Sequence, residues 1–348
     1  MNRYEHGGDI YSRQITCDFS ANINPLGMPD GVLEVLTRHV AECSNYPDVN
    51  CTALTEAIAA HENVKTEQIV CGNGAADLIY RIVWALKPEK ALLPAPTFSE
   101  YEKALHSVGC SVSYHRLCEK DDFALQDDFL LEIEGNDMIF LCSPNNPTGR
   151  IVPGELLWQI AERCLEKDCM LVIDQCFMDF VGEDARDAAG VAWYDRMLRN
   201  RNVIILKAFT KIYAMAGLRL GYCLCGDLEL ANRIWNCGQC WSVSVPAQLA
   251  GVAALKEKDY VKRTVRLIRR EREYLAASLL KLGLKVYPSE ANFLLFRCSA
   301  PLDRMLLEEG IAIRNCGNYE GLEYGFFRIA VRRHKENEML LRAMERIL

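Results

Sequence analysis

The strongest constraint on the fold is an alternation of short apolar runs with longer amphipathic stretches between residue 69 and about residue 225. The apolar runs predict buried strands at residues 69–71, 91–93, 138–142, 170–173, 203–206 and 222–224. The stretches with helical spacing are residues 77–86, 99–108 and 155–167. This alternation predicts an α/β fold with a mostly parallel sheet covered on both faces, and in such sheets ligands bind at the carboxyl ends of the strands.

The last third of the chain changes character and predicts an α+β unit. Residues 246–256 and 260–281 indicate a long helical connection with room for a kink. Strands are expected near residues 292–297, 311–314 and 327–331, with a closing helix from residue 335. We expect the N-terminal forty residues to complete this unit. Because 348 residues are too many for one compact core, we predict three parts: an N-terminal arm that contributes to the small domain (1–45), a large domain (46–250) and a small domain (251–348).

Charge and hydropathy exclude several classes of protein. The chain has 40 Lys and Arg residues against 47 Asp and Glu residues, a formal net charge of −7, which argues against a general nucleic-acid binder. No apolar run approaches the ~20 residues that a membrane-spanning helix needs, and residues 1–6 lack the apolar core of a signal peptide. We therefore expect a cytoplasmic protein that binds neither nucleic acid nor membrane.

Sixteen cysteines are many, but a cytosol keeps thiols reduced. Cys237 and Cys240 form one Cys-x-x-Cys pair. A zinc site needs four ligands, and no second such pair and no histidine pair stands at a suitable spacing. We interpret the pair as free thiols and predict no metal.

Three connections after predicted strands carry small or polar residues at the edge where ligands would bind. Residues 72–77, Gly-Asn-Gly-Ala-Ala-Asp, precede a helix, and such a turn lets backbone N–H groups close on an anion, although most glycine-rich turns are only turns. Asn146, in the segment 143–149, either stiffens a turn or points its amide into a site. Asp174 either caps a helix or faces a cationic group.

Lys211 and Arg219 stand eight residues apart after the predicted strand 203–206. A lone lysine is most often a solvated surface charge, but a lysine in a semi-enclosed site can lose its charge and form a Schiff base. An arginine offers a fixed fork of donors to a phosphate. The pair favours a site that contains both a reactive amine and a phosphate-binding group.

Taken together and in this order, these motifs resemble those of the fold-type-I pyridoxal-phosphate enzymes of the aminotransferase class I/II superfamily, over nearly the whole chain. The resemblance implies that Lys211 is the Schiff-base lysine and that Asp174 pairs with the pyridine nitrogen, which keeps the ring an electron sink. It implies that Asn146 bonds the 3-oxygen of the ring and that Phe98 stacks on the ring face. The residues implied in binding the cofactor phosphate are Gly74, Ala75, Thr210, Arg219 and, from a second subunit, Tyr46.

One departure from the family pattern concerns the residues after Asp174. Relatives often carry a tyrosine three residues after this aspartate, and here that residue is Phe177. The hydroxyl that would bond the ring oxygen is therefore missing, which leaves Asn146 with less help. Gln175 also replaces a more usual glutamate.

Both ends of the chain resemble one branch of this superfamily, the threonine-phosphate decarboxylases of cobalamin biosynthesis. The motifs that carry this resemblance are residues 6–9, 18–27, 313–322 and 327–332. The resemblance implies a homodimeric decarboxylase of L-threonine O-3-phosphate whose substrate contacts come from His6, Gly7, Gly8, Asn24, Asn146, Arg314 and Arg328. Arg314 and Arg328, with Arg332 as a further candidate, would form a basic wall inside an acidic protein.

The sister branch, the histidinol-phosphate aminotransferases, shares the core motifs and both arginines but fits the His-Gly-Gly opening poorly. Spacing does not separate decarboxylation from transamination, because the outcome depends on which bond of Cα stands perpendicular to the ring. Two alternatives therefore stay open. One is an aminotransferase of histidinol phosphate or another phosphorylated amino acid, and the other is a decarboxylase of serine phosphate, which differs by one methyl group.

Overall fold

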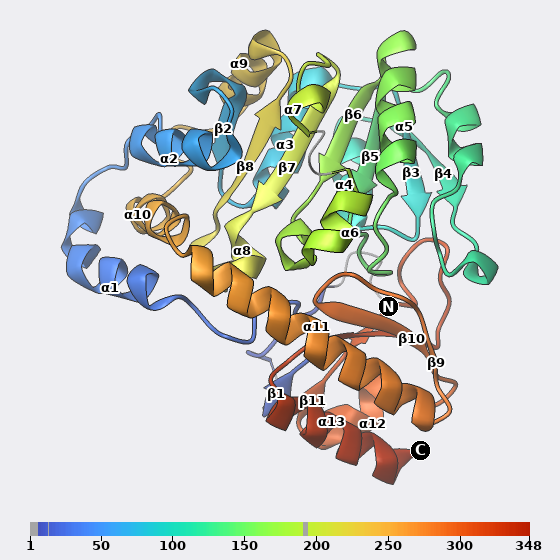
Figure 1. The fold of residues 1–348 in the computed structure, drawn as a ribbon. Helices are drawn as coiled ribbons and strands as arrows, with labels where there is room; N and C mark the ends of the chain where they lie inside the picture. The colour runs from blue at the N-terminus through green and yellow to red at the C-terminus, as the bar shows by residue number, and fades with distance from the viewer. Residues whose placement is uncertain (1–5, 13, 191–193) are drawn as a thin grey trace.

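The structure, a computed structural model, describes residues 6–12, 14–190 and 194–348. Its centre is a seven-stranded sheet in the order β2-β8-β7-β6-β5-β3-β4 (Figure 1). The strands are β2 (Ile69–Gly72), β3 (Lys90–Ala95), β4 (Ser111–Arg116), β5 (Met138–Cys142), β6 (Met170–Asp174), β7 (Val203–Ala208) and β8 (Gly221–Cys225). Only β8 runs antiparallel to its neighbours β2 and β7, and the other pairs are parallel. The predicted α/β fold with a mostly parallel sheet is confirmed.

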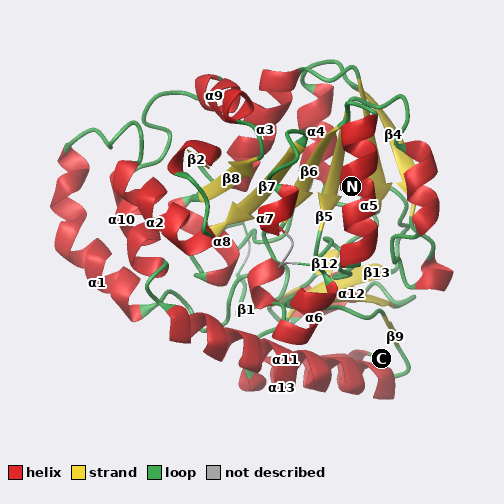
Figure 2. Ribbon diagram, turned by 45° about the horizontal axis from the view of Figure 1, so that its top comes forward, coloured by secondary structure: helices red, strands yellow, loops and turns green. Residues whose placement is uncertain are grey.

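Alternate residues of the strands enter two separate cores, one on each face of the sheet. In β6, Val172 packs into the core formed with helices α3 (Ala75–Leu86), α4 (Ser99–His106) and α9 (Leu228–Asn236). Its neighbours Leu171 and Ile173 face the opposite core, which contains the apolar side of α5 (Gly154–Glu166). Figure 2 shows helices on both sides of the strands. Because both faces of the sheet are covered, each of the strands β5, β6 and β7 is a nearly continuous apolar run in the sequence.

Strand β4 is the one strand of this sheet that the sequence did not predict. It lies at the edge of the sheet. Ser111–Tyr114 alternate between exposed and partly buried positions, and of the last two residues His115 is buried and Arg116 exposed. An edge strand needs no continuous apolar run, so the pattern used to find the other strands is absent here. The three predicted helices are confirmed, with ends that differ by two residues or fewer.

The C-terminal part contains a four-stranded antiparallel sheet in the order β12-β13-β10-β9. Its elements are β9 (Lys285–Val286), β10 (Phe293–Arg297), α12 (Leu302–Glu308), β11 (Ile311–Ala312), β12 (Arg314–Asn315), β13 (Phe326–Ala330) and α13 (His334–Ile347). The N-terminal strand β1 (Cys17–Asp18) pairs in parallel with β11. The expected contribution of the N-terminal residues to this α+β unit is confirmed, whereas the predicted domain boundaries stay a prediction.

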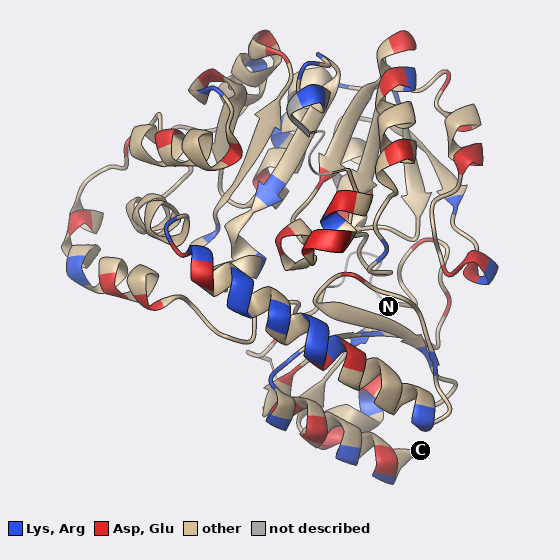
Figure 3. Cartoon of the chain, in the orientation of Figure 1, with Lys and Arg blue, Asp and Glu red and all other residues tan. Residues whose placement is uncertain are grey.

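Two helices connect these parts. They are α10 (Val245–Ala254) and the 24-residue α11 (Lys258–Lys281), and the helical backbone is interrupted at residues 255–257. The expected helical connection is therefore present, and its two stretches are separate helices with a break between them. Helix α10 packs against α1 (Asp30–His39) and α2 (Thr52–Glu62). Lysine and arginine residues gather along α11, in a chain that is acidic as a whole (Figure 3).

The remaining short helices lie in the connections. They are η1 (Val40–Ser44), η2 (Thr66–Gln68), η3 (Glu119–Asp121), η4 (Asp127–Glu132), η5 (Met178–Phe180), α6 (Glu183–Ala188), α7 (Tyr194–Met197), α8 (Phe209–Ile212) and η7 (Ala216–Leu218). Within the described ranges, no helix combines the length and the apolar character needed to span a membrane.

Candidate active site

A cavity of about 210 Å³ lies where the carboxyl ends of β5, β6 and β7 meet the β12–β13 pair. Of the residues predicted to form the site, it brings together His6, Gly7, Ala75, Phe98, Asn146, Asp174, Thr210, Lys211, Arg219, Arg314 and Arg328. These residues are far apart in the sequence, and they meet because parallel strands present their carboxyl ends at one edge of the sheet.

Lys211 lies on the short helix α8, directly after β7. Burial lowers the pKa of its amine, and the nearby guanidinium groups of Arg219 and Arg328 lower it further, against the opposing effect of Cys176 and Asp174. The backbone carbonyl of Lys211 accepts a hydrogen bond of 3.1 Å from the backbone N–H of Asn24. A lysine with a lowered pKa is neutral more often and is therefore a better nucleophile.

Asp174 is the last residue of β6 and is buried. Its Oδ1 accepts a 2.9 Å hydrogen bond from the backbone N–H of Cys176, and its Oδ2 accepts one of 2.6 Å from the hydroxyl of Tyr101. Burial raises the pKa of this carboxyl, while the bonds from Cys176 and Tyr101 oppose the rise. With both oxygens already holding one donor, the carboxylate has a fixed orientation toward the cavity.

The amide of Asn146, buried after β5, points its oxygen at the opposite wall. Oδ1 accepts hydrogen bonds from the Tyr319 hydroxyl, at 3.1 Å, and from Nη1 of Arg328. The preceding residue holds the turn in place. Asn145 donates to Thr148 of the same turn at 3.0 Å and to the backbone carbonyl of Pro96, in the loop after β3, at 2.9 Å, and it accepts from Thr97 of that loop at 2.8 Å. Of the two adjacent asparagines, one therefore shapes the turn and the other faces the cavity.

The glycine-rich turn after β2 forms a close cradle with Arg219. Gly74 has φ +84°, and a Cβ at this position would lie only 2.6 Å from Nη2 of Arg219. Ala75 begins the twelve-residue helix α3, whose N-terminal N–H groups favour an anion. Thr210 lines the cavity beside them, and the Arg219 side chain is exposed. These groups fit the phosphate of pyridoxal phosphate, just as Lys211, Asp174 and Phe98 fit its carbonyl group, its ring nitrogen and its ring face.

Arg314 and Arg328 are direct partners in the register of β12 and β13, and both are buried. Arg314 donates to the backbone carbonyl of Asn315 and to Oδ1 of Asn318, at 2.6 and 2.7 Å. Arg328 donates to the backbone carbonyl of Ser20 at 2.9 Å, and its buried Nε has no partner among the described residues. Arg332 does not line the cavity, because it pairs with Glu336 at 2.6 Å on α13.

The N-terminal residues cover one side of the cavity. Nε2 of His6 lies 2.8 Å from Oε1 of Glu100, and its ring lies 5.7 Å from that of Phe98, centroid to centroid. Gly7 packs so closely that a Cβ would lie 2.3 Å from the backbone oxygen of Ser20. Gly8 is outside the lining, but its N–H donates to Oγ of Ser20 at 2.8 Å, which fixes this segment.

Besides Gly8 and Gly74, which adjoin the cavity without lining it, two predicted site residues are not brought to the cavity. Asn24 is buried, and its Nδ2 donates to the backbone carbonyl of Ile212 and to Thr264, at 2.7 and 2.8 Å. Tyr46 is 80% exposed and stacks on Trp241 with ring centroids 4.6 Å apart. Its predicted contact with the cofactor depends on a second subunit, and so it stays a prediction.

Sequence reasoning also missed residues that line the cavity. They are Ser20, Ala21, Asn22, Ala76, Tyr101, Cys142, Cys176, Phe177, Ala208 and Tyr319. Tyr101 follows Phe98, the residue that caps α4, by three residues. This i, i+3 spacing could have predicted that both rings face the same side of the helix. For Phe177, the sequence indicated only that a tyrosine hydroxyl is absent. In the structure its ring packs edge-on against that of Phe293, with the ring centroids 5.1 Å apart.

Comparison with known proteins agrees with this geometry. The family model described as aminotransferase class I and II matches residues 15–347. The threonine-phosphate decarboxylase of Salmonella typhimurium is 37% identical over 99% of this chain and 96% of its own length. The solved histidinol-phosphate aminotransferase of Clostridium acetobutylicum is 31% identical, with a TM-score of 0.87 over 95% of this chain and 98% of that chain.

A third similarity concerns the fold alone. The histidinol-phosphate aminotransferase of Sinorhizobium meliloti, solved in complex with pyridoxal 5'-phosphate, has a TM-score of 0.86 at 23% identity, over 97% of this chain and 93% of that chain. The chain belongs to the aminotransferase class I and II family, whose members depend on pyridoxal phosphate, as the sequence motifs predicted.

Proposed function

We propose that this chain is a carboxy-lyase that uses pyridoxal phosphate to convert L-threonine O-3-phosphate to (R)-1-amino-2-propanol O-2-phosphate and CO₂, for cobalamin biosynthesis. The observation that carries the proposal is the buried pair Arg314 and Arg328, opposite each other at a cavity that also contains Lys211. Adjacent like charges repel, so this pair suits a substrate with two anionic groups, a phosphate and a carboxylate. The 37% identity to a threonine-phosphate decarboxylase supports the same choice.

When bound, pyridoxal phosphate supplies a protonated aromatic ring that accepts the electron pair left on Cα. In this proposal Asp174 holds the proton on the ring nitrogen. Its carboxylate is suited to this role because Tyr101 and Cys176 donate to its two oxygens and oppose the effect of burial. Lys211 would bind the cofactor carbon through its amine, whose pKa is lowered by burial and by the two nearby guanidinium groups.

The reaction exchanges one bond of Cα for another. The bond from Cα to the carboxylate carbon breaks, CO₂ leaves, and a proton takes its place on Cα. The arginine that binds the carboxylate would hold it out of the ring plane, where the breaking bond overlaps the π system. Lys211 lies in the same cavity, and its amine, once displaced by the amino group of the substrate and protonated by it, would deliver a proton to Cα.

One of the two arginines would bind the substrate phosphate, together with His6 of the N-terminal segment. Nε2 of His6 lies 2.8 Å from Oε1 of Glu100, and this contact holds the imidazole ring at the edge of the cavity. The unpartnered Nε of Arg328 offers a further donor toward a ligand. A homodimer and a cytoplasmic location belong to the same proposal.

A second candidate is an aminotransferase of histidinol phosphate or another phosphorylated amino acid. It is favoured by the 31% identity and TM-score of 0.87 to the histidinol-phosphate aminotransferase of Clostridium acetobutylicum. The two reactions use the same cofactor and the same pair of arginines. They differ in whether Cα loses its carboxylate or its proton.

Mass analysis of the products separates these candidates. The purified holoenzyme is incubated with threonine phosphate, with and without a keto acid, and with serine phosphate and histidinol phosphate in parallel. We expect CO₂ and a phosphorylated amine without any keto acid, at many turnovers per site. Formation of one equivalent of pyridoxamine phosphate, without CO₂ and with turnover only when a keto acid is added, would assign the chain to the aminotransferases instead.

A further inference from the structure

The oxygen of the Asn146 amide holds two donors, and this fixes which way the amide faces. A guanidinium group can only donate hydrogen bonds, so the atom of Asn146 that faces Nη1 of Arg328 must be the oxygen and not the nitrogen. The Tyr319 hydroxyl donates to the same oxygen at 3.1 Å. Nδ2 of Asn146 has no hydrogen-bond partner within the described residues, so its two N–H groups remain available to a ligand in the cavity.

Tyr319 is suited to remain a donor. Its side chain is buried, and burial raises the pKa of its hydroxyl, so the group stays protonated at neutral pH. The guanidinium of Arg314 lies over its ring, 5.4 Å from the centroid. Backbone hydrogen bonds on both sides, to Cys316 at 3.0 Å and from Leu322 at 3.1 Å, hold the residue in a compact turn.

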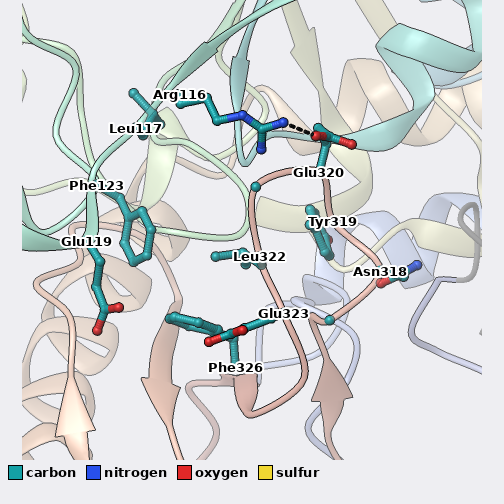
Figure 4. Close-up of a pocket in the computed structure, with 12 residues that line it drawn as sticks. Arg116, Leu117, Glu119, Phe123, Asn318, Tyr319, Glu320, Leu322, Glu323 and Phe326 are labelled. Atoms are coloured by element: carbon teal, nitrogen blue, oxygen red, sulfur yellow. Dashed lines mark hydrogen bonds and ion pairs between the residues drawn. The ribbon is translucent and has the colours of Figure 1, made fainter.

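This turn belongs to the loop 316–325 between β12 and β13, which separates two cavities. On one side is the active-site cavity, and on the other is a second cavity of about 580 Å³ between this loop and residues 116–123 (Figure 4). Tyr319 lines both of them. Cys316 and Tyr319 of this loop are buried in the core, while its residues between the two cavities depend on specific contacts for their position.

Specific contacts of this kind tie the loop to the large sheet and to β10. Arg116, at the end of β4, pairs with Glu320 at 2.6 Å, and Figure 4 shows this ion pair bridging the two walls. Arg297, at the end of β10, pairs with Glu323 at 2.9 Å. Gly321, at φ +83°, lies so close to the backbone of Ala95 that a Cβ would be 3.1 Å from its oxygen. These contacts lie outside the active-site cavity. They fix the position of the loop, and thereby the position of the Tyr319 hydroxyl.

We infer that Tyr319 is a positioning residue that acts through Asn146. With Arg328, its hydroxyl holds the amide oxygen, so that the amide N–H groups point at the 3-oxygen of pyridoxal phosphate. This compensates for Phe177, which supplies no hydroxyl of its own. The inference rests on the contact between Asn146 and the cofactor ring in the proposed function, but not on which amino acid is the substrate.

Tyr319→Phe tests this inference, because it removes only the hydroxyl and keeps the ring under Arg314. A hydrogen bond to the 3-oxygen stabilises the deprotonated form of the bound cofactor, so weakening that bond should move the pH midpoint of the cofactor's visible absorption to higher pH. We expect kcat to fall about three- to tenfold, as for the loss of one hydrogen bond, with KM nearly unchanged. The other charged or titratable groups that line the cavity are the same in both proteins; they are His6, Tyr101, Cys142, Asp174, Cys176, Lys211, Arg219, Arg314 and Arg328.

The matched control is Tyr324→Phe, on the same loop. Tyr324 is 47% exposed and donates to Asp303 at 3.2 Å, away from the cavity, so its variant should keep the wild-type midpoint and kcat. The decisive comparison is a double-mutant cycle with Asn146→Ala. If Tyr319 acts through Asn146, then Tyr319→Phe should change neither midpoint nor kcat once Asn146 is alanine.

An unchanged midpoint in Tyr319→Phe, or an equal effect of this substitution with and without Asn146, would overturn the inference. These outcomes are independent of the reaction itself, since the absorption of the holoenzyme is measured without substrate. If the protein transaminates but Tyr319→Phe shifts the midpoint and the double-mutant cycle is non-additive, the proposed decarboxylase is contradicted and the role of Tyr319 is supported. If the protein decarboxylates threonine phosphate but Tyr319→Phe leaves the midpoint unchanged, the proposed function is supported and the role of Tyr319 is contradicted.

Discussion

The hydroxyl of Tyr101 donates a 2.6 Å hydrogen bond to Oδ2 of Asp174, from a helix 73 residues earlier in the chain. The Tyr101 ring stacks on Phe140 of β5, with centroids 4.8 Å apart and planes 11° from parallel. A buried carboxylate is stable only when its oxygens have donors. This contact therefore links the apolar core under the sheet to the group proposed to control the cofactor ring.

Tyr101→Phe should lower the free energy of unfolding by about 1–3 kcal/mol, because it leaves one oxygen of a buried carboxylate without its donor. It should also raise the pKa of Asp174 further above its ordinary value, since one of the bonds that opposes burial is lost. Urea unfolding of the holoenzyme measures the first effect. Tyr11→Phe, at a side chain that is 92% exposed, is the matched control. Equal unfolding midpoints for the two variants would contradict a stabilising hydrogen bond from Tyr101 to Asp174.

Lys211→Ala should abolish the covalent attachment of the cofactor and all turnover, while the fold stays intact. After borohydride reduction, wild-type protein should gain the mass of one reduced cofactor on the peptide that contains Lys211, and the variant should not. Lys258→Ala, at an exposed position in the first turn of α11, should behave as wild type. Wild-type turnover in Lys211→Ala would remove Lys211 from its assigned role.

Arg314→Ala and Arg328→Ala should each weaken binding of threonine phosphate about ten- to a hundredfold, because each removes a charge-assisted bond to a desolvated anion. Both variants should keep pyridoxal phosphate through Lys211 and Arg219. The variant that lacks the phosphate-binding arginine should also lose its preference for threonine phosphate over threonine. Arg304→Ala, on the exposed side of α12, is the control, and the measurement is KM for both substrates. Unchanged KM values in both active-site variants would refute the basic wall.

Glu119 predicts a pH dependence of stability. Hydrogen bonds from Lys285, at 2.9 Å, and Tyr287, at 2.6 Å, with the charge of Arg297, lower the pKa of Glu119 to about 2. A lowered pKa of an acid stabilises the fold above the unfolded-state pKa of 4.5, and this contribution is lost as the pH falls toward 2. Glu119→Gln should therefore destabilise the protein at pH 7 by up to about 1 kcal/mol, since the ion pairs are partly exposed.

The difference between the wild-type and Glu119→Gln unfolding midpoints should be constant between pH 5 and 7 and should narrow below about pH 4.5. Urea unfolding across this range, at constant ionic strength, gives the comparison. If the difference between the two unfolding midpoints grew as the pH fell, it would contradict the lowered pKa of Glu119 in the folded protein.

Tyr46 can reach a cofactor phosphate only across a subunit interface, so sedimentation should show a dimer. Tyr46→Phe keeps the stacking on Trp241 but loses the hydroxyl, and it should weaken cofactor binding several-fold without dissociating the dimer. Tyr324→Phe again serves as the control. A strictly monomeric protein with full activity would exclude Tyr46 from the site.

Local pattern was sufficient for the buried strands and for the residues at their ends. The apolar runs at β5, β6 and β7 locate Asn146, Asp174 and Lys211, because the polar residue after a buried strand must lie at the edge of the sheet. The local sequence pattern was not sufficient to find residues whose contacts join distant parts of the chain. Tyr319 meets Asn146 over 173 residues, and no spacing in the sequence encodes that contact. The exposed edge strand β4 was missed for a different reason, the absence of an apolar run.

The reversed direction of β8 has a consequence for the order in which the protein is made. Because β8 turns back beside β7, Lys211 and Arg219 belong to one short connection, and the other residues proposed to hold the cofactor all precede them in the chain. The arginines proposed to select the substrate come about a hundred residues later, on β12 and β13. As synthesis proceeds from the N-terminus, the residues proposed to contact the cofactor are all made before the substrate wall, whereas Tyr319, which is inferred to orient Asn146, is made together with that wall. In order of synthesis, the contacts to the cofactor thus come first, and both their orientation by Tyr319 and the residues that recognise the substrate come later.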